Sequence, residues 1–165
     1  MFISDFEKYK TEIRDLNLTQ KKQKPSAHSS SLQVIVSLLK NKKYVEAIAI
    51  LEELKKKGDI KNVHHQIYHF LGDAFAGLEN YESAIVNYSK ALKTRILEEI
   101  LLTKLAIQHQ KNGKDELAVK FYQRALKFKP DSAFIHNNLG TALLNLGFNL
   151  KAKASLEKAL NFNPK

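Results

Sequence analysis

A repeat period of about 34 residues is the feature that most constrains this sequence. Leu139-Gly140 matches Leu105-Ala106 and Leu71-Gly72 at two successive intervals of equal length, and the match continues after each pair. Self-similarity at this length is typical of a repeat array, in which each unit buries its apolar face against the next. The matching positions that follow are Phe75, His109 and Leu143; Ala84, Ala118 and Ala152; Tyr88, Tyr122 and Leu156; and Ala91, Ala125 and Ala159.

The period divides most of the chain into four repeats, and each repeat is predicted to be two helices joined by a short turn. Gly113 and Gly147 fall at matching points between the two helices, where the turn needs a positive φ that glycine adopts freely. Pro130 and Pro164 end the second helices of the last two repeats. The repeats span about residues 31–61, 65–98, 99–132 and 133–165.

Composition limits the kinds of partner and site that the chain offers. The formal net charge is +10, but only three of the 27 basic residues are Arg. Arg is the preferred residue for bidentate phosphate recognition, so a solvated lysine-rich surface is favoured and nucleic-acid binding is disfavoured. The sequence has no Cys, which excludes disulfides, zinc–thiolate sites and Cys nucleophiles, and we expect a cytoplasmic protein. No apolar run is long enough to span a membrane.

The repeat resembles the tetratricopeptide repeat (TPR), a helix–turn–helix of about 34 residues with the pattern W-x2-L-G-x2-Y, then A-x3-F and P. Repeat two matches with Tyr68, Leu71-Gly72, Phe75, Ala84 and Tyr88. Repeat three departs more, because Ala106 replaces Gly and His109 replaces the aromatic residue. The resemblance implies an all-α fold, a right-handed α-solenoid with a concave groove. A bundle of antiparallel helices in another arrangement is the structural alternative.

An extra helix is predicted ahead of the array. Ser4 and Glu7 form a capping box, and the apolar residues that follow share one stripe, so residues 1–18 are predicted to be an amphipathic helical segment. Residues 19–30 are polar and contain Pro25, and we expect a flexible basic and Ser-containing linker. An isolated helix this short is marginal in water, so docking of the 4–16 stripe into the groove is a hypothesis.

The resemblance also implies which residues would bind a partner, because the first helix of each repeat lines the groove in this family. Positions on that helix that the fold does not require are free to carry function. Amide side chains there would bond a peptide backbone, and apolar side chains would contact its side chains. An ordinary solvated surface is the alternative. The candidates are Gln66, His69, Phe70, Asp73, Thr103, Lys104, Ile107, Phe134, Asn137, Asn138 and Thr141, with Ile100, Lys111 and Asn145 beside them.

Some members of the family hold the C-terminal carboxylates of chaperones between Lys and Asn side chains of the groove. His69 and Asp73 stand at the Lys and Asn positions of that clamp in this sequence. Because Asp73 would repel a terminal carboxylate, we expect no chaperone-tail binding of this type.

Catalytic and metal-binding patterns are weak throughout the sequence. His65, His69 and Asp73 share one helix face at i, i+4 and i+8, but ligands spread over two turns do not converge on one ion. We find no Ser-His-Asp order, no Gly-rich phosphate loop and no pair of carboxylates in a cleft. We therefore expect no metal, no cofactor and no enzyme activity in this chain.

The sequence predicts a protein-interaction scaffold that binds a partner peptide or helix in the groove. The alternative is a substrate-recruiting N-terminal module of a larger bacterial glycosyl- or sulfotransferase, because Asn137-Asn138-Leu139-Gly140 resembles repeats that precede such domains. The last helix ends without a polar cap, so Leu156, Leu160 and Phe162 are expected to be partly bare. Either the chain continues in a longer protein or another chain covers this helix, which makes self-association through it a hypothesis.

Overall fold

The computed structural model describes residues 27–56 and 64–163, and these residues form eight α-helices and no strand. The predicted all-α class is confirmed. The predicted helix over 4–16 lies outside the described residues. The helices are α2 (Ala27–Lys40), α3 (Tyr44–Lys56), α4 (His64–Gly77), α5 (Tyr81–Leu92), α6 (Glu98–Lys111), α7 (Asp115–Ala125), α8 (Ala133–Asn145) and α9 (Asn149–Phe162).

The chain divides into two compact units, residues 1–37 and 38–165. In the first unit the described part is the N-terminal portion of α2. This helix begins at Ala27. Residues 27–30 are therefore helical, whereas their polar composition predicted that they belong to a linker. After Pro25 the stretch contains neither Gly nor Pro, and serines alone do not stop a helix that an apolar run continues.

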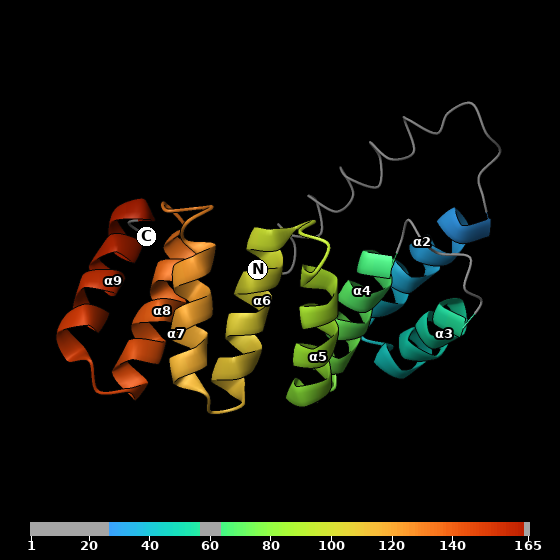
Figure 1. Ribbon diagram of the computed structural model, residues 1–165, viewed down its shortest axis with the longest axis horizontal. Coiled ribbons are helices and arrows are strands. Elements are labelled where there is room, and N and C mark those ends of the chain that lie inside the picture. The colour runs from blue at the N-terminus through green and yellow to red at the C-terminus, as the bar shows by residue number, and fades with distance from the viewer. Residues whose placement is uncertain (1–26, 57–63, 164–165) are drawn as a thin grey trace. The chain divides into compact units, whose positions relative to one another are not determined.

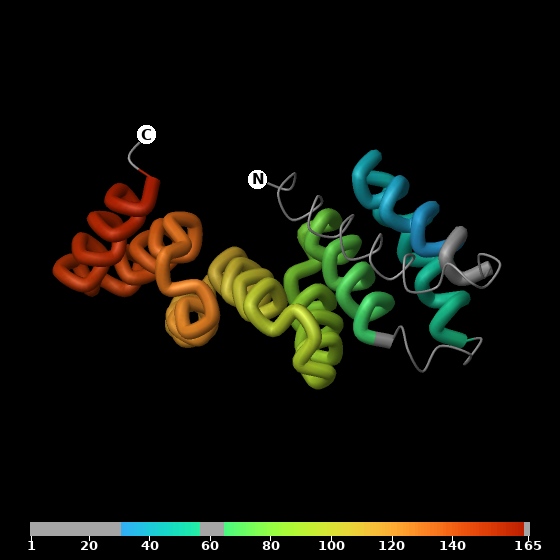
Figure 2. Tube along the Cα trace, turned by 90° about the horizontal axis from the view of Figure 1, so that it is seen from above, coloured from blue at the N-terminus to red at the C-terminus, as the bar shows by residue number. Residues whose placement is uncertain are grey.

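The second unit is a succession of helix pairs. α4 packs most closely on α5, α6 on α7, and α8 on α9, and these pairs follow one another along the unit (Figures 1 and 2). Successive pairs are joined by packing of α5 on α6 and of α7 on α8. α6 also contacts α8, whereas no comparable contact joins α7 and α9. In repeats three and four the first helices therefore lie closer together than the second helices.

Small residues allow the two helices of each repeat to approach. A Cβ atom added at Gly72 would overlap the ring of Tyr88, and one added at Gly140 would lie 2.7 Å from Cγ of Leu156. Ala106, at the matching position of repeat three, is fully buried. These three positions must be small because the two helices of each repeat cross closely there.

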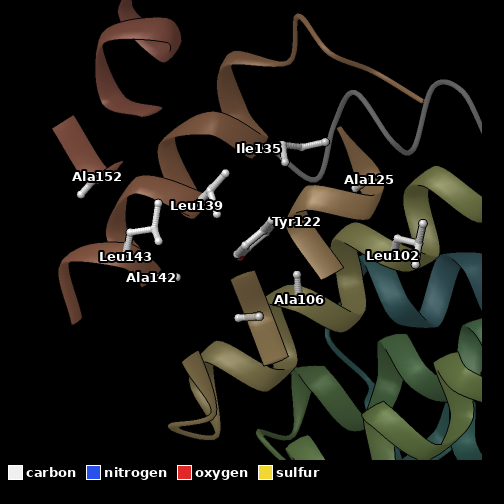
Figure 3. Packing of buried hydrophobic residues seen from close by; sticks show 10 residues of the cluster. Leu102, Ala106, Tyr122, Ala125, Ile135, Leu139, Ala142, Leu143 and Ala152 are labelled. Atoms are coloured by element: carbon white, nitrogen blue, oxygen red, sulfur yellow. The ribbon is translucent and has the colours of Figure 1, made fainter. Parts of the chain in front are cut away.

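The core runs continuously from repeat three into repeat four (Figure 3). Tyr122 of α7 is fully buried between residues of α6 and α8. Burial of a large apolar side chain contributes about 2 kcal/mol to the free energy of folding. Most of the burial of this cluster depends on packing against the neighbouring repeat. The cluster contains Leu102, Ala106, Ala118, Tyr122, Ala125, Ile135, Leu139, Ala142, Leu143 and Ala152.

The turns between the two helices of a repeat share one geometry. Gly113 and Gly147 have φ values of 68° and 77°, as predicted, and Lys42 and Glu79 occupy the matching positions with φ values of 58° and 59°. At Gly113 the backbone N–H donates to Gln110 O at 3.0 Å, and the next N–H donates to His109 O at 2.8 Å. This is the Schellman pattern, which requires a left-handed residue whether or not the sequence supplies a glycine.

Two alanine substitutions separate close packing from backbone conformation. We expect Gly72→Ala to lower the free energy of unfolding by about 2–3 kcal/mol, because the new methyl group overlaps the Tyr88 ring. Gly113→Ala should cost only about 1 kcal/mol, because a Cβ there meets nothing within 4 Å and only the positive φ opposes it. Urea titration of both variants measures the two costs, and equal losses would contradict this explanation.

Candidate functional site

Asp73 of α4 joins three helices. Its Oδ1 accepts hydrogen bonds from Tyr88 Oη of α5 at 2.6 Å and from Lys104 Nζ of α6 at 2.7 Å. The Asp73 and Lys104 side chains are 22% and 16% exposed, and Tyr88 is almost fully buried. A charge this far from water needs a close partner of opposite sign, and Lys104 supplies one. The bond to Lys104 also connects repeat two to repeat three.

His69 lies on the same face of α4, one turn before Asp73. Its Nε2 is 3.6 Å from Asp73 Oδ2, and its side chain is 1% exposed. Burial lowers the pKa of His69 to about 4; Asp73 opposes this shift and Lys104 adds to it. The imidazole is therefore neutral near pH 7. We call His69, Asp73, Tyr88 and Lys104 the Asp73 cluster.

The pKa values of the Asp73 carboxyl and the Tyr88 hydroxyl shift in opposite directions. Burial raises the pKa of the Asp73 carboxyl, but Lys104, His69 and the hydrogen bonds from Lys104 and Tyr88 outweigh it, so the net pKa is below its ordinary value. The pKa of the Tyr88 hydroxyl is raised, first by burial and then by Asp73. The cluster therefore contains a carboxylate, an ammonium group and a neutral phenol near pH 7.

The structure places several predicted groove residues in the interior. His69 and Phe70 are 1% and 4% exposed, so the expectation that these two side chains face outward is wrong. Their rings stack with centroids 5.9 Å apart, and the His69 ring also lies 5.9 Å from that of Tyr88. Asp73 and Lys104 are bonded to each other. Gln66 is half-buried, and its Oε1 has no hydrogen-bond partner among the residues that the structure describes.

The candidates of repeat three are also used mainly within the fold. The Thr103 hydroxyl donates to Glu99 O at 3.0 Å. Ile107 is half-buried and packs against the core, and Ile100 is 7% exposed. These residues offer little side-chain surface to a partner.

Repeat four differs, because its candidates remain at the surface of α8. Asn137 and Thr141 are exposed, and Phe134 and Asn138 are half-buried. Asn138 Nδ2 donates to Phe134 O at 2.9 Å, and the Thr141 hydroxyl donates to Asn137 O at 3.1 Å. These bonds fix the two donors, and within residues 27–56 and 64–163 they leave the Asn138 Oδ1 and the side-chain amide of Asn137 available. The predicted residues of this repeat are therefore brought together on one helix.

Leu144 belongs to the same surface and was missed by the sequence interpretation. It is 47% exposed and follows Phe134, Asn137 and Thr141 at helical spacing. The signal was present, since an apolar residue at i+10 from Phe134 falls on the same stripe. We call Phe134, Asn137, Asn138, Thr141 and Leu144 the α8 face. Beside it, Asn145 Nδ2 donates to both carboxylate oxygens of Asp115, at 3.2 Å from Oδ1 and 3.3 Å from Oδ2.

The sequence interpretation also missed the role of the tyrosine hydroxyls. Tyr88 was recognised only as a matching position of the repeat, but its hydroxyl donates to Asp73. The Tyr122 hydroxyl similarly donates to Gln110 Oε1 at 3.0 Å. A tyrosine in place of phenylalanine at these buried positions was the available signal, because a buried hydroxyl usually has a partner.

The described residues hold no group of three or more His, Cys, Asp or Glu side chains that could bind a metal ion. Among the described helices none is long and apolar enough to cross a membrane. On α9, Leu160 and Phe162 are 60% and 49% exposed. Self-association through that helix stays a prediction.

Comparison with known proteins identifies the repeat. A model described as "Tetratricopeptide repeat" matches residues 65–95 and 135–165, and one described as "TPR repeat" matches residues 110–147. Together the matches cover just over half of the chain. The chain belongs to the tetratricopeptide repeat family. No curated protein shows significant sequence similarity to the chain.

Solved structures of MamA share the TPR fold of this chain. One crystal structure of MamA is 20% identical and has a TM-score of 0.74, with 96% of this chain and 94% of that chain covered. MamA (41-end) from Desulfovibrio magneticus RS-1 is 14% identical with the same TM-score, covering 81% of this chain and 74% of that chain. The chain is thus a right-handed α-solenoid of TPRs. At these identities the likeness shows the fold alone.

The pKa of His69 predicts an acid-sensitive fold. The unfolded chain protonates this histidine near pH 6.5, whereas the folded chain resists protonation until about pH 4. The contribution of His69 to the free energy of unfolding should therefore be fully present above pH 6.5. It should fall by about 3 kcal/mol between pH 6.5 and pH 4. In His69→Gln this part of the pH dependence should disappear. Urea titrations across the window test this, and parallel curves for the two proteins would contradict it.

Proposed function

We propose that this TPR protein is a non-enzymatic interaction scaffold that binds an extended peptide on the α8 face. The observation that carries the proposal is the contrast between repeats. Most of the first-helix candidates of repeats two and three are buried, half-buried or bonded internally, whereas Asn137 and Thr141 of repeat four remain exposed. A surface that the fold does not require and that combines amide and apolar groups supports peptide recognition.

The spacing of the α8 face supports a particular peptide length. Phe134 and Leu144 are ten residues apart, which is about 15 Å along a helix. An extended chain rises about 3.3 Å per residue, so four to five residues span this distance. Side chains at i and i+4 of an extended peptide point to the same side. The preferred ligand has two apolar side chains four residues apart, one beside Phe134 and the other beside Leu144.

The polar centre of the α8 face supports recognition of the peptide backbone between those side chains. Asn137 has both a donor and an acceptor, and Asn138 presents an acceptor because its Nδ2 already donates to Phe134 O. None of the five residues of the α8 face is charged, and the nearby Asp115 is bonded to Asn145. A neutral peptide is therefore favoured over one with a terminal carboxylate.

The proposal is tested with a random-peptide library selected on the full chain. The selected peptides should show two apolar residues four positions apart. Asn137→Ala should weaken the best peptide about fivefold to tenfold, because about 1 kcal/mol is lost with its hydrogen bonds. Asn161→Ala, an exposed asparagine on α9, is the matched control and should change the affinity less than about twofold, within the usual range for surface substitutions.

Isothermal titration of the wild-type chain and both variants gives the dissociation constants. Equal affinities for Asn137→Ala and Asn161→Ala would refute binding on the α8 face. Selected peptides with a required C-terminal carboxylate would refute the neutral-ligand proposal.

A further inference from the structure

The turns that connect one repeat to the next have a chemical pattern that the fold does not need. Lys93, Arg95 and Ile96 follow α5, and Lys127, Phe128 and Lys129 occupy the turn after α7, one repeat period later. All six side chains are exposed; Ile96 is 45% and Phe128 is 54% exposed. Phe162 stands one period after Phe128 and is 49% exposed. We call these seven residues the basic edge.

The residues of the basic edge lie at the same end of successive repeats. In Figure 1 the α5–α6 turn, the α7–α8 turn and the C-terminal end of α9 all lie along the upper side of the second unit. Arg124 at the end of α7 lies 3.9 Å from Glu98 at the start of α6. His136 Nε2 is 2.9 Å from Pro130 O, and its ring stacks on Phe162. These contacts connect each turn to its neighbour.

Basic residues outnumber acidic residues in the turns that carry the basic edge. The turns over residues 93–97 and 127–132 contain four basic residues and a single acid, Asp131. The turns at the opposite end, over residues 41–43, 78–80, 112–114 and 146–148, contain three bases, Lys42, Lys43 and Lys114, and one acid, Glu79, but Lys43 lies 3.4 Å from Glu46. Favourable interaction with the helix dipole explains a base in the last turn of a helix, but not Arg95 and Lys129, which lie beyond the helix ends. It also does not explain the exposed apolar side chains.

The backbone of the first turn holds its residues in this arrangement. Arg95 and Leu97 have φ values of 56° and 59°, in the left-handed region that costs a non-glycine residue about 1–2 kcal/mol. Leu97 packs against the core while Arg95 and Ile96 stay exposed. The turn therefore keeps an unfavourable conformation in which a base and an apolar residue project into solvent.

We infer that the basic edge docks on an anionic lipid bilayer. Exposed apolar side chains between lysines fit the boundary of head groups and acyl chains, where the ring or alkyl group enters the bilayer and the ammonium groups stay at the phosphates. Single-stranded nucleic acid fits less well, because Phe162 already stacks on His136, which leaves Phe128 as the one ring of the edge for a base, and one Arg serves the whole edge. This surface is separate from the α8 face, so the inference goes beyond peptide binding.

Sedimentation of the full chain with vesicles tests the inference. The chain should bind vesicles of equal parts phosphatidylserine and phosphatidylcholine and should dissociate from them as the salt concentration rises. It should not bind vesicles of pure phosphatidylcholine. The double variant Lys127→Gln, Lys129→Gln should bind about 20-fold more weakly, since each lysine near the surface contributes about fivefold. The matched control Lys151→Gln, Lys153→Gln removes the same charge from exposed positions on α9 near the opposite end and should lose less than about threefold.

A second pair of variants tests the apolar contribution. Phe128→Ser should weaken vesicle binding about tenfold, whereas Phe148→Ser, a 51% exposed phenylalanine at the opposite end, should change it little. Circular dichroism confirms that each variant is folded. Equal losses for the test and control variants, or no binding to either vesicle, would overturn the inference. A chain that shifts single-stranded RNA but does not sediment with vesicles would overturn it as well.

Discussion

The carboxylate of Asp73 is the group on which the arrangement of repeats two and three depends. It is held inside the protein by a hydroxyl from α5 and an ammonium group from α6, at 2.6 Å and 2.7 Å. A buried charge is tolerated only where its partners are close, so the cluster is satisfied in one relative placement of the three helices. Apolar packing alone is less selective, because Ala and Leu contacts allow small shifts. The Asp73 cluster therefore fixes the register of repeat three on repeat two.

The same bonds decide where a partner can bind. Once Asp73 and Lys104 neutralise each other and His69 is buried, the first helices of repeats two and three have few free polar groups. Repeat four contains Asn138 at the position of Lys104 and Thr141 one turn beyond Asn137, so its surface is neutral and open. The basic edge consists of the turns after α5 and α7 together with Phe162 at the end of α9. The proposed peptide site and the inferred membrane-docking edge share no residue, so each can be substituted without changing the other.

Much of the fold follows from the sequence because repeat packing is periodic. The repeat period predicted the helix pairs and the positive φ at Gly113 and Gly147, since each depends on residues at fixed spacing. The left-handed conformations of Lys42 and Glu79 were not predicted, because the Schellman geometry there is imposed by the helix ends and no glycine marks it. The helical start of α2 was missed because composition does not detect a helix boundary.

The candidate site was less predictable for a physical reason. Whether a first-helix side chain faces a partner or the next repeat depends on pairs such as Asp73 and Lys104, which are far apart in the sequence and meet only after the repeats stack. Spacing places His69 on the outer stripe, but the rings of Phe70 and Tyr88 surround it and exclude water. On α8 no such pairing partner exists among the described residues for Asn137, so its predicted exposure agrees with the structure.

A double-mutant cycle on Asp73 and Lys104 tests this account most directly. The free energy of unfolding would be measured by urea titration for Asp73→Asn, Lys104→Met and the double variant. If the pair connects repeats two and three, the two losses should not add, and the coupling energy should be about 2 kcal/mol. A coupling energy below about 0.5 kcal/mol, the usual value for independent sites, would show that the bond contributes little and would contradict the account.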